Sequence, residues 1–357
     1  MELLSVTMND GVKPRSEIEG KDNSSEDKSN YKIVRKGDMV YNSMRMWQGA
    51  NGISPCDGIV SPAYTVLMPT QEINNGYFAA LFKSANMINE FRKNSQGMTS
   101  DTWNLKYPQI ETIKIQIPSV SEQDKVSELF GVLDARIVAQ AQLVESLKKY
   151  KRGVVRTLLS PKHCSIKNVK WTTSRIGDIG IFIKGAPLSK ADISLEGTPF
   201  ILYGELYTTY SEVISNVVRK TQASVDKQYY SQIGDVIIPT SGETPEEIST
   251  ASCVMLPDII LAGDLNIYRC TQVDGRIMSY ILNHVVNDRI ARIAQGKSIV
   301  HVQAAEISKI EITYPDPFSQ KTIIAILAAI SDRIDQSNAE LRLLNELRKA
   351  LLQKLFI

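Results

Sequence analysis

Two long stretches of the chain carry apolar residues at alternating spacings of four and three, as expected for helices that pack along their whole length. They cover residues 121–159 and 319–357, and in each stretch eight of ten such positions are apolar. We call these twenty positions the heptad seam: Val126, Phe130, Leu133, Ile137, Gln140, Val144, Leu147, Lys151, Val154 and Leu158, then Ile323, Leu327, Ile330, Ile334, Ser337, Leu341, Leu344, Arg348, Leu351 and Leu355. A seam kept for over four heptads favours a coiled coil.

The two stretches interrupt the heptad seam at the same places, with Gln140 and Lys151 in the first, and Ser337 and Arg348 in the second. Polar residues in such a seam fix the register of two helices at a cost in stability, so we predict that these four align the pair. Pairing Lys151 with Ser337 and Gln140 with Arg348 fits an antiparallel arrangement, because the residue numbers of both pairs have the same sum. Two independent amphipathic helices, each packed on its own domain, remain the alternative.

The regions before these helices have a different pattern. Short β-rich runs alternate with Gly, Pro, Asp and Ser over residues 177–318, and they predict strands at 180–183, 199–202, 235–238, 254–256 and 310–314. One stretch, 275–294, places five apolar residues near one helical face: Ile277, Ile281, Val285, Ile290 and Ile293. We therefore predict a mixed α/β module, and a similar module in the first part of the chain with its helix near 77–92.

The two halves of the chain repeat at an offset of 197 residues. Gly234-Asp235-Val236 corresponds to Gly37-Asp38-Met39, and Tyr314-Pro315 corresponds to Ile117-Pro118. Gln295-Gly296 corresponds to Gln96-Gly97 after a drift of two residues. Because Met1 aligns with Thr198, we expect the first module to be shortened: it lacks a counterpart of 171–197, which includes a strand signal at 175–179.

Composition narrows the class of protein. The 357 residues suffice for two or three domains, and no apolar run reaches the roughly 18 residues of a membrane span. The first 30 residues show no secretory signal, so we expect a cytoplasmic protein. Four cysteines without a C-x-x-C pair and three histidines without ligand spacing give no metal site. A net charge of +2 neither requires nor excludes a nucleic acid.

The order of α/β module, long helix, linker, second module and second helix resembles the specificity subunit of type I restriction-modification enzymes. The marks of the family lie at the helix starts, where Glu122-Gln123 follows Pro118, and where Pro317 and Gln320 follow Pro315. The first copy has Val120 where a second proline is usual, and the second has Ser319 in place of the glutamate.

The resemblance covers the whole chain and implies an α+β fold, with two repeated mixed α/β target-recognition domains separated by two long antiparallel coiled-coil helices. The implied domains are a shortened first target-recognition domain at 1–118, a central helix at 119–160, a linker at 161–170, a second target-recognition domain at 171–318 and a C-terminal helix at 319–357. We call 1–118 the first module and 171–318 the second module.

The resemblance also implies the partners. Each module would read one half of a bipartite site in double-stranded DNA, while the helices dock two methyltransferase subunits and a restriction subunit joins the assembly. S-adenosylmethionine, ATP and Mg²⁺ would be bound by those partner subunits, and this chain would hold no cofactor, no metal and no membrane contact. A helix of 39 residues extends about 58 Å, or about 17 base pairs, so the helices could act as a ruler between half-sites.

No catalytic residues are predicted. An amino-methyltransferase of this lineage needs an N/D-P-P-Y/F turn, and only Pro315-Asp316-Pro317-Phe318 comes near it, without two consecutive prolines. No P-loop, nuclease cluster joined to a helicase set, or Ser/His/Asp signature is evident. The alternative function is a non-catalytic coiled-coil scaffold or adaptor that binds only proteins.

The candidate DNA contacts are cations and amides, which bind phosphates and base edges. In the first module the loop 43–49 places Arg45 and Gln48 beside Trp47 and a flexible glycine, although Trp47 could instead belong to the core and Arg45 be a solvated charge. The corresponding loop 240–247 is acidic, so the modules would read different sequences, and Glu243 could accept a hydrogen bond from a cytosine amine. The full set of candidates is Lys13, Arg15, Arg45, Gln48, Arg92, Lys93, Lys184, Lys190, Arg289, Arg292 and Lys297.

Overall fold

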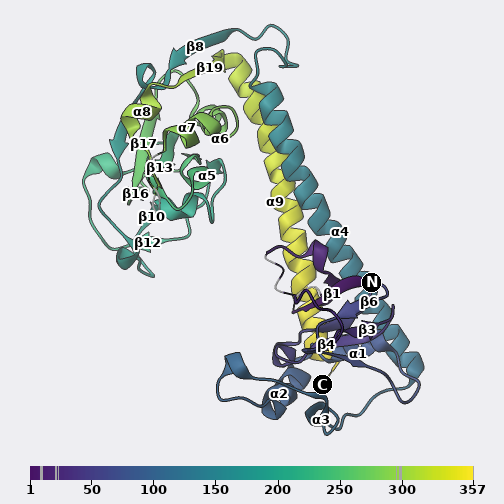
Figure 1. Ribbon diagram of the computed structural model, residues 1–357. Coiled ribbons are helices and arrows are strands. Elements are labelled where there is room, and N and C mark those ends of the chain that lie inside the picture. Colours follow the sequence, from purple (N-terminus) through teal and green to yellow (C-terminus); the bar gives the residue numbers. More distant parts are fainter. Residues whose placement is uncertain (9–10, 21, 23, 295, 297–299, 357) are drawn as a thin grey trace. The chain divides into compact units, whose positions relative to one another are not determined.

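The computed structural model describes residues 1–8, 11–20, 22, 24–294, 296 and 300–356. The chain divides into two compact units, one formed by Met1–Val144 with Gln336–Ile357 and the other by Glu145–Asp335. Each unit contains an α/β module and one part of each of two long helices (Figure 1). The expected α+β fold class is therefore confirmed.

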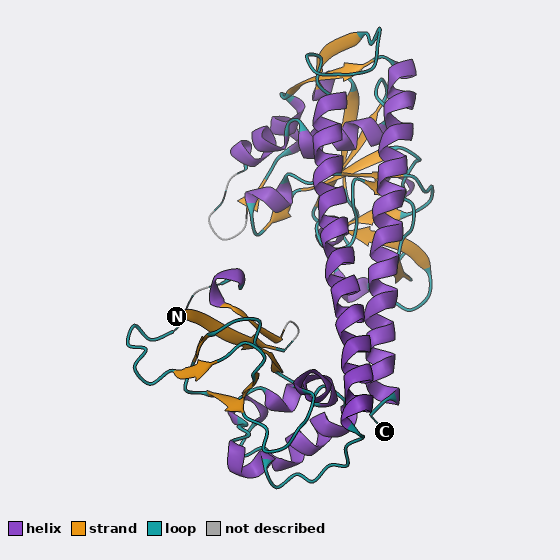
Figure 2. Ribbon diagram, turned by 90° about the vertical axis from the view of Figure 1, so that its right-hand side faces the viewer, coloured by secondary structure: helices purple, strands orange, loops and turns teal. Residues whose placement is uncertain are grey.

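The two long helices are α4, Val120–Leu158, and α9, Pro317–Lys354 (Figure 2). They run antiparallel: in the first unit the Gln140 side-chain amide donates to the Ser337 carbonyl (3.0 Å), and the Arg136 guanidinium donates to Glu340 (2.6 Å). Of the twenty seam positions, all of which are described, Leu355 alone is exposed. The predicted seam is thus confirmed.

The predicted register of the helix pair is wrong. Gln140 meets Ser337, its own counterpart in the repeat, whereas Arg348 pairs with Asp134 on α4 (2.5 Å). Lys151 pairs with Glu212 of the second module (2.7 Å). A carboxylate stabilises a buried or half-buried cation more than a neutral polar residue does. Lys151 and Arg348 therefore both pair with acids outside the seam.

The first module contains two small sheets. The four-stranded sheet has the order β2-β1-β6-β3 and the three-stranded sheet has the order β5-β4-β7. Their strands are β1 Glu2–Thr7, β2 Gly11–Pro14, β3 Lys32–Val34, β4 Met39–Asn42, β5 Asn51–Ile53, β6 Gly58–Val60 and β7 Tyr64–Leu67, and the helices are α1 Asn75–Leu81, α2 Ala85–Asn94 and α3 Tyr107–Ile110. The single helix predicted near 77–92 is two helices, because Ser84 caps a new one by accepting from the Met87 N–H (3.3 Å).

The second module is larger. Its main sheet has the order β11-β15-β13-β17-β9, beside a sheet of order β12-β10-β16 and the pairs β8 with β19 and β14 with β18. The strands are β8 Trp171–Arg175, β9 Gly180–Lys184, β10 Thr198–Leu202, β11 Val213–Ile214, β12 Lys220–Thr221, β13 Asp235–Pro239, β14 Ser241–Gly242, β15 Ser252–Val254, β16 Ile260–Ala262, β17 Leu265–Cys270, β18 Val300–His301 and β19 Glu311–Pro315. The helices are α5 Pro245–Ile248, α6 Gly275–His284, α7 Asn287–Ile293 and α8 Ala304–Ser308.

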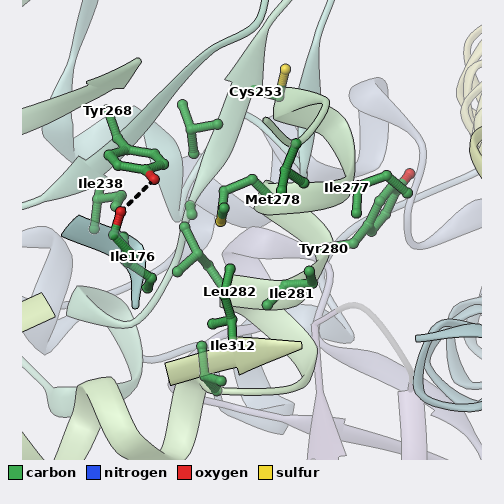
Figure 3. Close-up of a cluster of buried hydrophobic side chains, with 14 of the residues drawn as sticks. Ile176, Ile238, Cys253, Tyr268, Ile277, Met278, Tyr280, Ile281, Leu282 and Ile312 are labelled. Atoms are coloured by element: carbon green, nitrogen blue, oxygen red, sulfur yellow. Dashed lines mark hydrogen bonds between the residues drawn. The ribbon is translucent and has the colours of Figure 1, made fainter. Parts of the chain in front are cut away.

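Most predicted elements of the second module occur within one or two residues of their expected places. The exceptions are local: 275–294 forms two helices that break at Val285–Val286, and the run 254–256 shares only Val254 with β15. In the segment 175–179, which carries a strand signal, only Arg175 belongs to a strand, as the last residue of β8. The chain then continues as the 3-10 turn η4 Ile176–Asp178. Its Ile176 lies in the core, where the Tyr268 hydroxyl donates to the Ile176 carbonyl (2.8 Å; Figure 3).

The repeat in sequence is also a repeat of hydrogen bonds. The N–H of Arg35 donates to the Asp38 carboxylate (2.8 Å), and the N–H of its counterpart Gln232 donates to Asp235 (2.8 Å). Leu105 N–H donates to the Ser43 carbonyl (2.8 Å), and 197 residues later Val302 N–H donates to Thr240 (3.0 Å). Among the described residues, β7 pairs only with β4, whereas β17 of the second module pairs with both β13 and β9.

A buried glutamine joins each long helix to its module. The Gln123 amide donates to the Pro118 carbonyl (2.9 Å) and accepts from the N–H of Asn74, the N-cap of α1 (2.9 Å). Gln320 makes the same two bonds, to Pro315 (2.8 Å) and from Asp274, the N-cap of α6 (2.8 Å). We call this arrangement the glutamine latch.

The caps of the two long helices use the same chemistry with the residues exchanged. At α4 the Ser119 hydroxyl donates to Glu122 (2.8 Å), and at α9 the Ser319 hydroxyl donates to Asp316 (2.7 Å). Ser319 thus occupies the position of Glu122, and the carboxylate of this cap lies three residues earlier, at Asp316, the counterpart of Ser119. Hydrogen bonds from Ser319 and from the Lys170 N–H lower the pKa of Asp316 to about 2, so this carboxylate is ionised at neutral pH.

Replacing Gln320 by alanine is expected to lower the free energy of unfolding by about 2–4 kcal/mol, because the Asp274 N–H and the Pro315 carbonyl would each lose a buried partner. Urea denaturation measures the change. Gln353→Ala, at an exposed position near the end of α9, is the matched control and should stay within about 0.5 kcal/mol of the native chain. Equal stabilities for the two variants would show that the glutamine latch adds no stability.

Candidate nucleic-acid interface

The loop that follows β4 brings several predicted DNA contacts of the first module together. Arg45 is exposed, and Gln48 ends the 3-10 turn η2 Met46–Gln48 that follows it. Between them, the Trp47 indole N–H donates to the Met44 carbonyl (3.2 Å). The Arg92 guanidinium, at the end of α2, lies 5.8 Å from the centre of the Trp47 ring.

A second tryptophan completes this surface. Trp103 packs edge-to-face on Trp47, with ring centres 5.2 Å apart. We call Arg45, Trp47, Gln48, Arg92 and Trp103 the first-module patch. An arginine fork and a glutamine amide match the edges of guanine and adenine, and a half-exposed indole can stack on a base. Sequence reasoning missed Trp103, whose signal was an isolated aromatic residue in a polar stretch.

The other candidates of the first module contact their own surroundings. Arg15 donates to the carbonyls of Ile18 (2.7 Å) and Gly20 (2.9 Å), and so orders the turn after β2. Lys13 lies half-buried on β2. Lys93 forms an ion pair with Glu90 one helical turn away (2.7 Å).

Two neighbouring cavities mark the second module. One of about 810 Å³ is lined by Lys190, Tyr203, Tyr207 and Glu243, among others. The other, of about 910 Å³, is lined by Lys184, Asn266, His301 and Gln303, among others. Both share Leu188, Gly263 and Asp264, so they adjoin each other. Lys184 and Lys190 are both exposed, and the structure therefore gathers these two candidates on one surface.

The remaining candidates of the second module lie elsewhere. Arg289 donates to the Glu311 carbonyl (2.9 Å) and lines a separate cavity of about 310 Å³. Arg292 is exposed in the last turn of α7. Lys297 lies outside the described residues. Arg289 therefore has a contact that holds α7 to β19.

The two modules place different chemistry at the same position of the repeat. The loop after β4 carries Arg45 and Trp47, whereas the corresponding loop after β13 carries the exposed Glu243. In that second loop the Ser241 hydroxyl donates to Asp264 (2.7 Å), which adds another carboxylate to the surface. A cationic surface suits acceptor edges of bases, and an acidic surface suits amino groups.

Within the described ranges no group of three His, Cys, Asp or Glu side chains is arranged to hold a metal ion. No helix among these residues is long and apolar enough to span a bilayer.

The fold is that of known type I restriction-modification proteins. A chain from a structure of the complex assembly and conformational transition of the type I R-M system matches 93% of this chain and 84% of its own length, with a TM-score of 0.61 and 16% identity. The type I restriction-modification S subunit from M. genitalium matches over 91% of this chain and 84% of its own length, with a TM-score of 0.58 and 16% identity. These likenesses define the class of fold.

Sequence comparison identifies the family. The putative type I restriction enzyme MjaX specificity subunit of Methanocaldococcus jannaschii is 23% identical over 294 residues, which cover 78% of this chain and 66% of that relative. The chain thus spans just under two thirds of that relative's length. The chain belongs to the family of type I restriction modification DNA specificity domains, whose sequence model matches residues 168–346. Its members are the non-catalytic specificity components of these systems. The family match confirms the predicted resemblance.

Proposed function

We propose that this chain reads a bipartite DNA site, with the first and second modules as target-recognition domains that read one half-site each. The observation that carries this proposal is the structural repeat with exchanged chemistry. The two modules repeat several hydrogen bonds 197 residues apart, yet the corresponding loops present Arg45 in one and Glu243 in the other. One scaffold used twice with different contact residues suits two different half-sites.

The proposal includes docking of two methyltransferase subunits on the long helices, joined by a restriction subunit. Exposed apolar residues recur at matching positions of the two helices, with Leu129 corresponding to Ile326 and Tyr150 to Leu347. Repeated exposed apolar positions suit two copies of one partner. S-adenosylmethionine, ATP and Mg²⁺ would then be held by the partners.

The test is to co-express the chain with a methyltransferase subunit and to map the methylated bases by single-molecule sequencing. We expect one motif with two defined half-sites and an unread spacer of fixed length, and DNA binding that weakens steeply with salt. Binding without any sequence preference would instead support the scaffold or adaptor that contacts only proteins.

Replacing Arg45 and Gln48 by alanine is expected to relax recognition at one half-site only. Each good bidentate contact discriminates against the wrong base by about 1–3 kcal/mol, so the methylation map should show degenerate bases in that half-site. Lys93→Ala is the control, because its ammonium pairs with Glu90. A loss that is uniform over all DNA sequences would place Arg45 on phosphate rather than on a base.

A further inference from the structure

Asn266 is a polar residue in an apolar position. It lies in β17, which has strand partners on both sides, and only 3% of its surface is exposed. Its neighbours Leu265 and Ile267 are buried in the core. The Asn266 side-chain nitrogen, Nδ2, is buried without a hydrogen-bond partner among the residues that the structure describes.

A buried amide nitrogen without an acceptor destabilises the folded chain, because its N–H groups lose their hydrogen bonds to water and gain none. Leucine or valine would suit a central strand better at this position. Buried polar groups in native structures nearly all have a hydrogen-bond partner, in the protein or in ordered water. The unpartnered nitrogen is therefore a donor that can take a ligand atom as its partner.

Asn266 lines the cavity of about 910 Å³, whose walls come from β9, β17 and the segment that enters α8. Lys184 is directly opposite Asn266 in the antiparallel pairing of β9 and β17, so both side chains lie on the same face of the sheet. Lys184, His301 and Gln303 line the same cavity and are exposed, whereas Asn266 is buried. The cavity thus combines exposed hydrogen-bond donors with a buried donor that has no acceptor in the part of the chain that the structure describes.

We infer that Asn266 is a specificity-determining residue of the second module, and that this cavity takes the edge of a purine base in the DNA site. An orphaned donor needs an acceptor, and the N7 atom of a purine supplies one. An asparagine amide matches adenine best, because its nitrogen donates to N7 while its oxygen accepts from N6. The Lys184 ammonium adds a cation for a nearby phosphate. This inference rests on the proposed function and names one base contact within it.

The test is Asn266→Leu in the full chain, co-expressed with the methyltransferase subunit and scored by its methylation map. We expect discrimination at one purine position of one half-site to fall about tenfold to a hundredfold, while the other half-site keeps its bases. The melting temperature should stay the same or rise, because the substitution removes an orphaned polar group.

Asn283→Leu is the matched control. Its amide is satisfied, since it donates to the carbonyls of Ala251 (2.6 Å) and Ser279 (2.9 Å), so this variant should melt lower and leave the motif unchanged. Lys184→Gln, at an exposed position, tests the same cavity without a change in the core and should weaken DNA binding uniformly over all sequences, with the motif unchanged. A lowered melting temperature with an unchanged motif in Asn266→Leu would make Asn266 structural and overturn the inference.

The proposed function and the role of Asn266 can fail separately. If the unaltered chain yields no bipartite motif, the proposed function fails. If the motif is present and Asn266→Leu leaves it unaltered, the inference fails while the proposed function stands.

Discussion

Replacing Glu212 by glutamine is expected to lower the free energy of unfolding of the second unit by about 3–5 kcal/mol. The Glu212 carboxylate lies 2.7 Å from the Lys151 ammonium of α4 and 2.7 Å from Nε2 of His284, the last residue of α6. Their side chains are only 10–15% exposed. The variant would leave the charge of Lys151 buried without a counter-ion, and such unpaired charges are among the most destabilising changes known.

The same carboxylate should make stability depend on pH. Burial alone would raise the pKa of Glu212, but the hydrogen bond with His284 and the charge of Lys151 outweigh burial and lower it to about 2 from 4.5. The folded state therefore favours the ionised form. The resulting stabilisation is fully present above pH 4.5, is lost as the pH falls toward 2, and amounts to roughly 3 kcal/mol. Urea unfolding at pH 6, 4 and 3 measures how this stabilisation falls with pH.

Two variants distinguish the loss of this ion pair from a general loss of packing. Glu212→Gln should abolish the acid-dependent part of stability that the native chain shows between the two pKa values. Lys151→Met combined with Glu212→Leu should recover most of the lost stability, because well-packed apolar residues often replace a buried ion pair at little cost. If Glu212→Gln were as stable as the native chain, Glu212 would not stabilise the second unit as a counter-ion of Lys151.

The long helices could be predicted closely from sequence because their signal is periodic and long. Their starts were placed within two residues, and the seam that predicted them is buried or half-buried except at Leu355. Their register could not be predicted in this way. Gln140 and Ser337 do meet within the seam, but Arg348 pairs with Asp134, an acid that the seam pattern does not contain, and Lys151 pairs with Glu212 of the second module.

The candidate site was predictable only in its residue types. Arg45 and Gln48 were identifiable as a cation and an amide beside an aromatic residue, and Arg92 as a cation at the end of a predicted helix. The fold then placed Arg92 over the ring of Trp47, which lies between the other two. Asn266 was not, because Leu265–Cys270 has the pattern of an ordinary strand. Its amide nitrogen has no partner among the described residues, and this is a property of the tertiary packing, which no local pattern encodes.

Inserting four residues after Ala141 in α4 is expected to lengthen the unread spacer of the DNA motif by one or two base pairs, with both half-sites unchanged. Four helical residues add about 6 Å, which corresponds to about two base pairs of duplex. They also rotate the following part of the helix by about 40°, so the usable gain can be smaller than the length alone implies. The seam survives as a stutter, since four residues shift a heptad pattern without abolishing its apolar face.

The structure suggests a paired design and a control for this ruler prediction. Because Gln140 meets Ser337 in the antiparallel pair, the position of α9 opposite Ala141 is next to Gln336. A second insertion of four residues after Asp335 therefore extends both helices together and should reinforce the longer spacer. Four residues inserted after Lys167, in the stretch 161–170 that contains no helix or strand, leave both helices at their native length. That control should keep the native motif. A methylation map with altered half-site bases and the old spacer would contradict the ruler, and an unchanged map in the paired variant would show that the helices do not set the distance between half-sites.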